Sequence, residues 1–520
     1  MTPETDHYPA VVPLSSFSQT TSLGQNASTQ TFELLADPAT LAIAAAVVTV
    51  VLGVAVVAAF VARGGGALGG LPVWPTKVTD HLEATRAHDE LGDVFLAAGF
   101  SGEPCVFVRG EHAPKVLCQM GSGNGKWTAP VGAKRSGFIV PSNLVQPMVA
   151  PTFFHIVGSA WKAARTALRC VFVPKPHTAA ATVAAADRVL GAAVPADAKH
   201  ATIDAQAVVH AVLRDTMFVA GVGQDATEAT VAEAAFQELE DAANDWRADD
   251  TIEHAKRLSP RVGEASDAAL DACDAATDAA IRRAASGDER AVRSVAAMLH
   301  ASLVASGTTD AAARTEASRT VFNLVVAGAE SNAISTAKTL AAIARDPELV
   351  AQLQAELDAA AAQSGDAADA AAARGASVPL LSAAVKEGLR LYTPATAALR
   401  VPDQDYRVTD GITIPAGTNV CVCFHALHHD ASVWPRPARF DPSRFLGARV
   451  SRPRHAFLPF SAGPRKCPGE AVAMQQARVV IASVLSRFTP VADAPVPSAH
   501  AAGFTEWSAT GIPVALTARG

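Results

Sequence analysis

A short loop near the end of this 520-residue chain constrains its fold more than any other feature. The loop reads FSAGPRKCPGE, so that one thiol, Cys467, lies between Gly463 and Gly469 and shortly after Arg465. Positive charge, backbone N–H groups and the start of a helix all stabilise a thiolate, which is the form of cysteine that binds metals. The two glycines allow a sharp turn and a close approach of the backbone to a flat partner. The loop therefore predicts a single thiolate ligand for a metal.

The other cysteines of the chain do not form a recognisable set of ligands. There are seven cysteines at irregular spacings and no CxxC pair, which argues against a disulfide framework and against a tetrahedral zinc site. Haem iron with an axial cysteine fits a lone thiolate, and this ligand favours cleavage of the O–O bond. The alternative is a buried, inert cysteine, which is common, but the charged glycine loop argues against it.

Five residues of the loop carry a resemblance to a known family. Phe460, Gly463, Arg465, Cys467 and Gly469 form the pattern Phe-x-x-Gly-x-Arg-x-Cys-x-Gly, which resembles the haem-binding loop of the cytochrome P450 monooxygenases. The resemblance implies haem b (iron protoporphyrin IX) as cofactor, with Cys467 as the axial ligand of its iron and all five residues at the cofactor. It also implies the cytochrome P450 fold, which is mainly α with a small β subdomain.

Two further motifs resemble the same family and occur in the expected order. KEGLR places Glu387 and Arg390 three residues apart, so both lie on one face of a helix and can pair. FDPSRF adds Arg444, and together the three resemble the Glu-Arg-Arg triad that holds the core of the family around the haem loop. We expect this triad to be structural and not catalytic.

Four positions resemble the residues that hold the haem propionates in the family. WKAAR places Trp161 and Arg165 on one helix face, Arg400 follows LYTPATAAL, and Arg465 precedes the cysteine. A guanidinium matches the geometry of a carboxylate well. WKAAR alone is equally compatible with a surface arginine beside a half-buried tryptophan. ALHHDASVW resembles the HRDP stretch of the family with His429 in place of arginine, so we assign His429 no role.

The segment VVAGAESNAIST resembles the oxygen-activating helix of the family. A glycine inside a helix costs about 1 kcal/mol relative to alanine, so Gly328 needs a local reason; the resemblance implies a widened turn that makes room for O2. Glu330 and Ser331 take the positions of the acid and the alcohol that deliver protons during O–O cleavage. Serine stands where threonine is usual and lacks the methyl group that fixes the rotamer. The alternative is a solvated Glu330 and a Ser331 without a role.

One apolar segment stands apart from the rest of the chain. Residues 39–62 carry no charge, and at 1.5 Å per residue they reach about 36 Å, enough to cross a hydrocarbon core of about 30 Å. A buried helix or a signal-peptide core is the alternative, but no basic residue precedes the segment. We therefore predict a tail at 1–38, a transmembrane anchor at 39–62, a Gly/Pro hinge at 63–75 and a haem-binding catalytic domain at 76–520.

The distribution of basic residues predicts the orientation of this anchor. Lysine and arginine occur only after residue 62, so the positive-inside rule places the catalytic domain in the cytosol. We expect a single-pass membrane protein of the endoplasmic reticulum, in preference to a plastid. In that orientation Asn26, in the tripeptide NAS, is a glycosylation acceptor on the lumenal side.

The body of the chain reads as mostly helical. Amphipathic helical patterns dominate 76–300, and two long helical stretches occupy 312–358, with Pro347 opening the second. The alternating stretch 406–424 predicts short strands, and 509–519 resembles the terminal hairpin of the family. The net charge of −7 and the pI of about 6.1 argue against a nucleic-acid partner.

These features together predict a haem-thiolate monooxygenase that inserts one atom of O2 into a lipophilic substrate. The haem loop and the following AMQQARVVIASVLSRF are most similar to the eukaryotic branch with fatty-acid omega-hydroxylases and carotenoid hydroxylases. Electrons would come from a separate NADPH-dependent cytochrome P450 reductase, because the chain shows no flavin or nicotinamide fingerprint. Two alternatives remain: an isomerase or dehydratase that acts on a hydroperoxide, and a non-catalytic haem sensor. The expected pocket positions Val325, Ala327 and 395–398 indicate only that the substrate is apolar.

Overall fold

The computed structural model describes residues 71–78, 81–99, 104–119, 127–128, 165–166, 176–195, 197–224, 228, 230–247, 252–364, 378–402, 404–447, 452–497, 508 and 510–519. All of them belong to one compact unit, Gly53–Gly520. The predicted anchor at 39–62, Asn26 and Trp161 lie outside the described residues. Within the described ranges, no helix is both long and apolar enough to cross a membrane.

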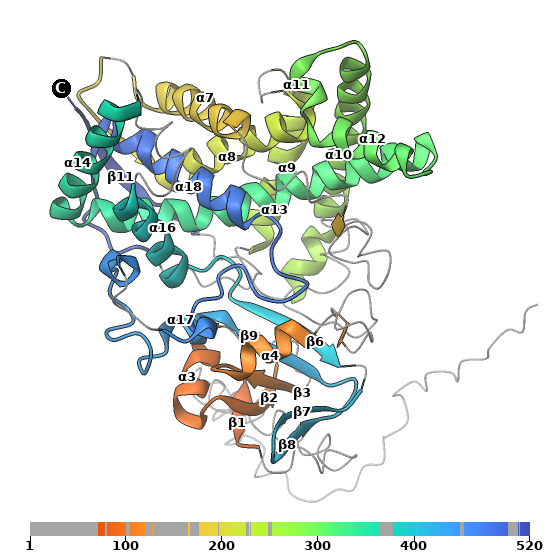
Figure 1. Ribbon diagram of the computed structural model, residues 1–520, viewed down its shortest axis with the longest axis vertical. Helices are drawn as coiled ribbons and strands as arrows, with labels where there is room; N and C mark the ends of the chain where they lie inside the picture. The colour runs from red at the N-terminus through yellow and green to blue at the C-terminus, as the bar shows by residue number, and fades with distance from the viewer. Residues whose placement is uncertain are drawn as a thin grey trace, which may run out of the picture. The chain divides into compact units, whose positions relative to one another are not determined.

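Helices make up most of the described chain (Figure 1). The long helices are α7 (Pro176–Ala193), α8 (Ala205–Val222), α9 (Thr230–Arg247), α10 (Ile252–Ala285), α13 (Asp310–Ala344), α14 (Pro347–Ser364), α16 (Pro379–Leu391) and α18 (Glu470–Leu485). The shorter ones are α3 (His81–Leu91), α4 (His112–Gln119), α11 (Glu289–Val292), α12 (Val295–Ala305) and α17 (Phe424–His429), with 3-10 turns η3 (Pro442–Phe445) and η4 (Arg454–Ala456).

The described strands form three sheets. A six-stranded sheet has the order β1 (Val73–Lys77), β2 (Val94–Ala98), β3 (Pro104–Val108), β9 (Asn419–Cys423), β6 (Ala397–Pro402) and β4 (Trp127–Thr128). A three-stranded sheet has the order β10 (Phe488–Val491), β11 (Pro513–Ala518) and β5 (His200–Asp204), and β7 (Tyr406–Thr409) pairs with β8 (Ile412–Ile414). The mainly α class with some sheet is therefore confirmed.

The large sheet is buried on both faces. Alternate residues of β2, β3 and β9 enter two different apolar clusters, one with Leu96, Val106 and Val422 and the other with Phe95 and Phe107. The rings of Phe95 and Phe107 stack across the β2–β3 pair with centroids 5.0 Å apart. Because both faces are covered, these strands are apolar throughout and show no alternation.

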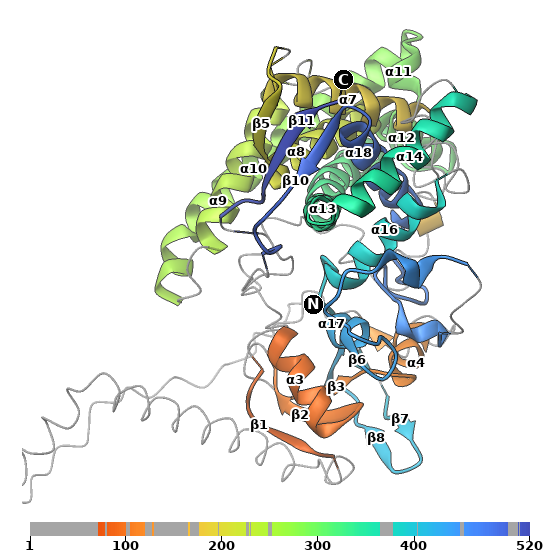
Figure 2. The ribbon, with the colours of Figure 1, turned by 90° about the vertical axis from the view of Figure 1, so that its left-hand side faces the viewer.

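The long helix α13 packs against several neighbours, and Figure 2 shows it almost end-on, with α8, α14, α16 and α18 around it. Its buried side chains join those of α8, α9 and α10 in the largest apolar cluster. Small residues allow close crossings. A Cβ on Gly388 of α16 would collide with Thr339 of α13, and a Cβ on Gly221 of α8 would lie 3.1 Å from Val321. These two close crossings hold α13 against α8 and α16.

Several predictions about the elements can now be compared with the structure. The two helices predicted in 312–358, the start of the second at Pro347, and the strands in 406–424 are confirmed. The segment 509–519 contains β11, which pairs with β10 and also with β5. The prediction that helices dominate 76–300 overlooked β2, β3 and β5.

The boundary that was predicted at residue 75 lies inside an element. Val73 and Pro75 belong to β1, which pairs with β2 in parallel. Leu71 and Trp74 are buried, and the Trp74 ring donates a hydrogen bond to Glu83 of α3. The end of the proposed hinge is therefore part of the folded body, because its apolar residues find a sheet and a helix to pack against.

Candidate functional site

The loop that carries Cys467 is held by its own backbone. The amide of Cys467 donates to the carbonyl of Phe460 at 2.9 Å, and the amide of Lys466 donates to the carbonyl of Gly463 at 3.0 Å. The side chain of Phe460 packs against the apolar cluster shared by α14, α16 and α18. Cys467 is exposed and precedes Gly469, the N-cap of α18. The loop thus presents a thiol at the start of a helix.

Gly463 is the glycine that this loop geometry requires. Its φ is +73°, in the left-handed region, and a Cβ there would lie 2.7 Å from Cα of Cys118 in α4. An L side chain would add both backbone strain and a collision. Gly469, in contrast, has a φ of −83°, which any residue can adopt, and a Cβ there would lie 3.8 Å from the Cys467 sulfur, an ordinary contact.

The surroundings of the Cys467 sulfur act on its pKa in opposite directions. Desolvation by the surrounding protein atoms raises the pKa, and Glu470 adds to this, while the Gly469 amide and the charges of Arg165 and Lys466 lower it. The pKa of Cys467 is raised overall. The reason is that desolvation outweighs the nearby charges, and Lys466 shares its charge with Glu470 in an ion pair. A bound metal ion would stabilise the thiolate, because a coordinating thiol is deprotonated by the ion.

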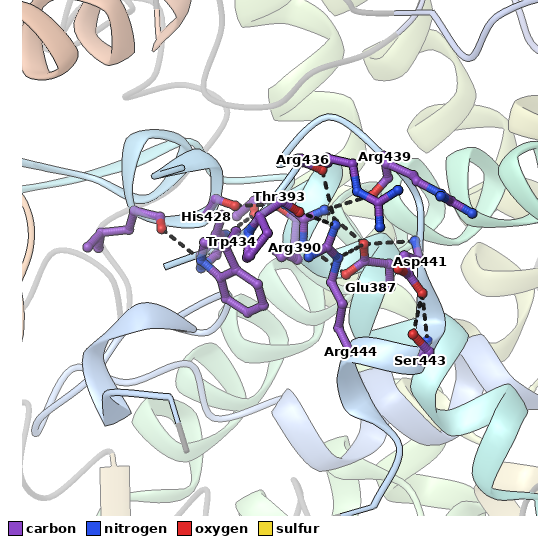
Figure 3. Close-up of polar contacts among 12 residues, drawn as sticks. Glu387, Arg390, Thr393, His428, Trp434, Arg436, Arg439, Asp441, Ser443 and Arg444 are labelled. Atoms are coloured by element: carbon purple, nitrogen blue, oxygen red, sulfur yellow. Dashed lines mark hydrogen bonds and ion pairs between the residues drawn. The ribbon is translucent and has the colours of Figure 1, made fainter. Parts of the chain in front are cut away.

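The triad predicted from KEGLR and FDPSRF forms a buried ion-pair network (Figure 3). Arg390 donates from Nε and Nη2 to the two carboxylate oxygens of Glu387, both at 2.8 Å, and both side chains are fully buried. Arg444 donates from Nε to Oε1 of Glu387 at 3.1 Å, and the amide of Asp441 donates to the same oxygen at 3.0 Å. Glu387 therefore joins α16 to the segment that leads to the cysteine loop.

His428 extends this network to the cysteine loop itself. Arg390 donates to the His428 carbonyl at 2.8 Å, and the amide of Leu458 donates to His428 Nε2 at 3.0 Å. Because Nε2 accepts, Nδ1 carries the proton and donates to Thr393 Oγ1 at 2.6 Å. Burial lowers the pKa of His428 well below its usual value and keeps the ring neutral. His428 was not among the predicted site residues, and the only signal for it in the sequence is the adjacent pair of histidines in ALHHD.

Three arginines that were predicted to hold propionates act on one another across the site. Burial, as the larger effect, and the charge of Arg165 lower the pKa of Arg465 to about 10, and burial and the charge of Arg465 lower that of Arg400 to about 10. Arg400 is buried, donates from Nη1 to the Leu399 carbonyl at 2.7 Å, and has no acceptor for its buried Nε among the described residues. This concentration of positive charge fits an anionic group with more than one carboxylate.

The segment predicted to activate oxygen lies inside α13. Residues 327–331 lie in the middle of this helix. Ser331 donates its hydroxyl proton to the Ala327 carbonyl at 2.7 Å, one turn earlier, and this Oγ is exposed. Glu330 is half-buried.

Gly328 has a packing reason that the sequence did not reveal. A Cβ at this position would lie 2.9 Å from the Met217 sulfur of α8. The glycine therefore lets α8 approach α13 directly beside Glu330 and Ser331. Val325, one of the expected pocket positions, is buried in the large apolar cluster, whereas Ala327 is exposed.

The charge of Arg165 acts on both the Cys467 thiol and Arg465, and the charge of Arg465 acts on Arg400, although positions 165 and 467 lie more than 300 residues apart in the sequence. Within the described ranges, no group of three or more His, Cys, Asp and Glu side chains is arranged to hold a metal. A lone thiol beside clustered guanidinium groups fits haem, whose porphyrin supplies the remaining metal ligands and whose propionates are anionic.

Comparisons with known proteins agree with this geometry. The sequence profile of the cytochrome P450 family matches residues 152–501, more than half of the chain. Cytochrome P450 4F5 of Rattus norvegicus is 46% identical over 120 residues, 23% of each chain, and leukotriene-B4 omega-hydroxylase 3 of Mus musculus is 42% identical over 120 residues, also 23% of each. Taurochenodeoxycholic 6 alpha-hydroxylase of Sus scrofa is 35% identical over 168 residues, 32% of each chain.

These matches are local. The chain spans about a quarter to a third of the length of the curated relatives it matches. The predicted similarity to a branch with omega-hydroxylases is confirmed, since one of these relatives carries that name.

Proposed function

The chain belongs to the cytochrome P450 family, and on that premise we propose that it is a haem-thiolate monooxygenase that hydroxylates a lipophilic substrate. The observations that support the proposal are the match of the family profile over residues 152–501, the Cys467 thiol before the first turn of α18, and the buried Arg400, whose Nε has no acceptor among the described residues. When bound, haem supplies the activation of O2 and its transfer to carbon. The protein would supply the thiolate ligand of the iron, the orientation of the haem and the protons that the reaction needs.

Cys467 would be the protein ligand of the haem iron. Its loop is fixed by backbone bonds at Phe460 and by the close contact of Gly463 with α4. The link through His428 to Glu387 and Arg390 holds the start of the loop without any titratable proton near neutral pH, because burial keeps His428 neutral. The sulfur is therefore held at a defined place before haem arrives.

Arg165, Arg400 and Arg465 would hold the haem carboxylates, with Trp161 as a fourth contact. Burial of Arg400 without an acceptor for Nε among the described residues is costly in the free protein. A carboxylate would remove that cost and would also relieve the mutual repulsion of the arginines. Haem binding is thus favoured by charge as well as by the thiolate.

Glu330 and Ser331 would deliver protons to the reacting oxygen. The Ser331 hydroxyl rests on the Ala327 carbonyl, so its lone pairs are open to receive a proton and its own proton can be passed on by rotation of Oγ. Glu330, one residue earlier on the same helix, would be the acid that replenishes it. Serine retains the hydroxyl that this relay requires.

Substrate, electron donor and location follow from the family and the anchor. We propose a lipophilic small molecule as substrate, in line with relatives named as leukotriene and taurochenodeoxycholic hydroxylases. Electrons would come from NADPH-cytochrome P450 reductase or a similar donor. The segment 39–62 would anchor the chain in the endoplasmic reticulum membrane, with the catalytic domain in the cytosol.

A carbon monoxide difference spectrum tests the proposal. The full chain, reduced with dithionite, is measured with and without CO beside Cys467→Ser and the matched control Cys118→Ser, which changes another exposed cysteine. We expect a red-shifted Soret band in the parent and in the control, and its loss in Cys467→Ser. An unshifted band in all three proteins, or no bound haem, would show that Cys467 is not the ligand and would end the proposed mechanism.

A further inference from the structure

A buried pair of amides connects the candidate proton-delivery helix with the helix that follows the cysteine. Asn332 comes directly after Ser331 on α13, and Gln476 lies on α18, which begins at Glu470. Asn332 Nδ2 donates to Gln476 Oε1 at 3.1 Å. Asn332 is 6% exposed and Gln476 2%, so the bond is shielded from water. It is a direct side-chain link between the two halves of the candidate site.

Neighbouring hydroxyl groups set the orientation of the Asn332 amide. Thr336 donates its hydroxyl proton to Asn332 Oδ1 at 3.3 Å, which turns Nδ2 toward α18. Ser335 donates to the Asn332 carbonyl at 3.3 Å and helps hold the same turn of α13. Asn332 is therefore oriented toward Gln476 by its own helix, so the pair is not a chance contact of two flexible side chains.

This polar link is energetically less favourable than apolar packing at the same place in the core. Gln476 Nε2 is buried and finds no acceptor among the described residues, which carries a desolvation penalty. Two apolar side chains of similar size would pack there at lower cost, and buried polar pairs are best explained where they fix the register of helices. Because Asn332 follows Ser331 directly, the pair fixes the register of Ser331 relative to α18, the helix that follows Cys467.

We propose that Asn332 and Gln476 are positioning residues that hold the Ser331 turn of α13 at a fixed distance from the Cys467 loop. This inference rests on the proposed function, because it concerns proton delivery at the haem. The two amides do not touch the reacting atoms. Without their bond, α13 samples a shifted register, the Ser331 hydroxyl leaves its place, and reduced oxygen escapes as hydrogen peroxide before substrate is oxidised.

Four variants of the full chain separate positioning from core filling. Gln476→Leu removes the acceptor and leaves Asn332 Nδ2 unsatisfied. The double variant Asn332→Leu with Gln476→Leu replaces the pair by apolar side chains. Gln476→Glu keeps an acceptor oxygen for Asn332. Gln354→Leu is the matched control, since Gln354 of α14 is an amide that donates to the carbonyl of Leu485, at the C-terminal end of α18, and to that of Phe488 in β10.

Three measurements are made on each variant: the urea midpoint, the infrared stretching band of CO bound to the reduced protein, and the hydrogen peroxide formed per NADPH oxidised with reductase. We expect Gln476→Leu to broaden or split the CO band and to raise peroxide formation roughly fivefold, the factor that corresponds to one lost hydrogen bond of about 1 kcal/mol. The double variant should regain the urea midpoint but keep the altered band and the high peroxide yield. Gln476→Glu should resemble the parent in both.

Two results would overturn the inference. In one, the double variant matches the parent in CO band and peroxide yield, which would make the pair mere core filling. In the other, Gln354→Leu alters the band and the yield as much as Gln476→Leu does. A parent without the red-shifted Soret band would instead refute the proposed function, so the two failures are distinguishable.

Discussion

Removal of the Glu387 carboxylate tests the central network of the fold. In Glu387→Ala, Arg390 loses two bonds of 2.8 Å, Arg444 loses one of 3.1 Å, and the amide of Asp441 loses its acceptor at 3.0 Å. Arg390 keeps only carbonyl acceptors, at His428 and Arg439. A fully buried cation would then remain without its counter-charge.

The expected loss of stability follows from this geometry. Breaking a buried ion pair by removing one partner costs about 3–5 kcal/mol, because the other charge stays buried. The Arg444 side chain is 10% exposed and keeps the carbonyls of Pro435 and Arg436 as acceptors, so it should add less to this loss than Arg390 does. We therefore expect Glu387→Ala to lower the free energy of unfolding by about 3–5 kcal/mol, a large share of the stability of an ordinary domain.

The assay is urea unfolding followed by near-ultraviolet circular dichroism, with bound haem measured on the same samples. The control is Asp410→Ala, which breaks the ion pair with Arg407 at 2.7 Å. Both of those side chains are exposed, so this change should cost less than about 1 kcal/mol. Haem retention should fall only in Glu387→Ala, since Arg390 and His428 connect Glu387 to the cysteine loop.

The reasoning would be refuted if Glu387→Ala unfolded within about 1 kcal/mol of the parent. Such a result would mean that solvent reaches Arg390 and replaces the carboxylate. A variant that is destabilised as expected but keeps its haem would refute a narrower point, the connection between this network and the cysteine loop.

Three further predictions concern the cysteine loop, the guanidinium groups and the buried imidazoles. Gly463→Ala should lower the free energy of unfolding in urea by more than about 2 kcal/mol. The control Gly417→Ala, at a residue with a φ of +77° but open space at Cβ, should lower it only by the backbone strain of about 1–2 kcal/mol. Equal losses would contradict the close contact of Gly463 with α4. Arg400→Leu should speed haem transfer to apomyoglobin roughly tenfold or more without lowering the urea midpoint of the haem-free protein; an unchanged rate would exclude a carboxylate contact. Burial lowers the pKa of His88 to about 3 and those of His425 and His428 well below their usual value. Each of these imidazoles binds a proton near pH 6.5 in the unfolded chain but not in the folded one, so each should lower the free energy of unfolding by about 1.4 kcal/mol per pH unit below pH 6.5. Urea midpoints between pH 7.5 and 5 check this: His88→Gln should reduce the slope by about 1.4 kcal/mol per pH unit, while His200→Gln, at an exposed site, should leave it unchanged.

Long helices and motif-bearing loops were predictable because their signals are local. The boundaries of α13 and α14 follow from Thr309 as N-cap and from Pro347 in the first turn. The contact of Glu387 with Arg390 follows from their spacing on one helix. The partner from the distant segment, Arg444, became predictable only through the resemblance to a family.

Strands β2 and β3 were missed for a physical reason. VFLAA and PCVFV are covered on both faces, so neither shows the apolar–polar alternation that marks a half-buried strand. Short apolar runs are equally compatible with a buried helix. The choice between strand and helix for β3 depends on the pairing of Phe107 with Cys421 of β9, more than 300 residues away.

The contacts that sequence could not supply are those between distant elements. Asn332 and Gln476 are ordinary polar residues within apolar helices, and nothing local indicates that they meet across 144 residues. The raised pKa of Cys467 was missed for the same reason, since desolvation depends on the atoms that surround the sulfur and not on its sequence neighbours. The spacing of residues in the sequence shows which charges lie near the sulfur, but not how many protein atoms from distant elements surround it.

The arrangement around Glu387 also sets an order of events during biosynthesis. Arg444, which completes the ion-pair network, is translated 57 residues after Glu387, which takes about 3–11 s at the usual rates of 5–20 residues per second. During that interval Glu387 and Arg390 have only each other, and α16 cannot bury either charge at low cost. Cys467 leaves the ribosome later still. A cofactor held by Cys467 would therefore be bound only after Glu387, Arg390 and Arg444 have all been made, and the nascent chain passes through a stage in which Glu387 and Arg390 are still in water.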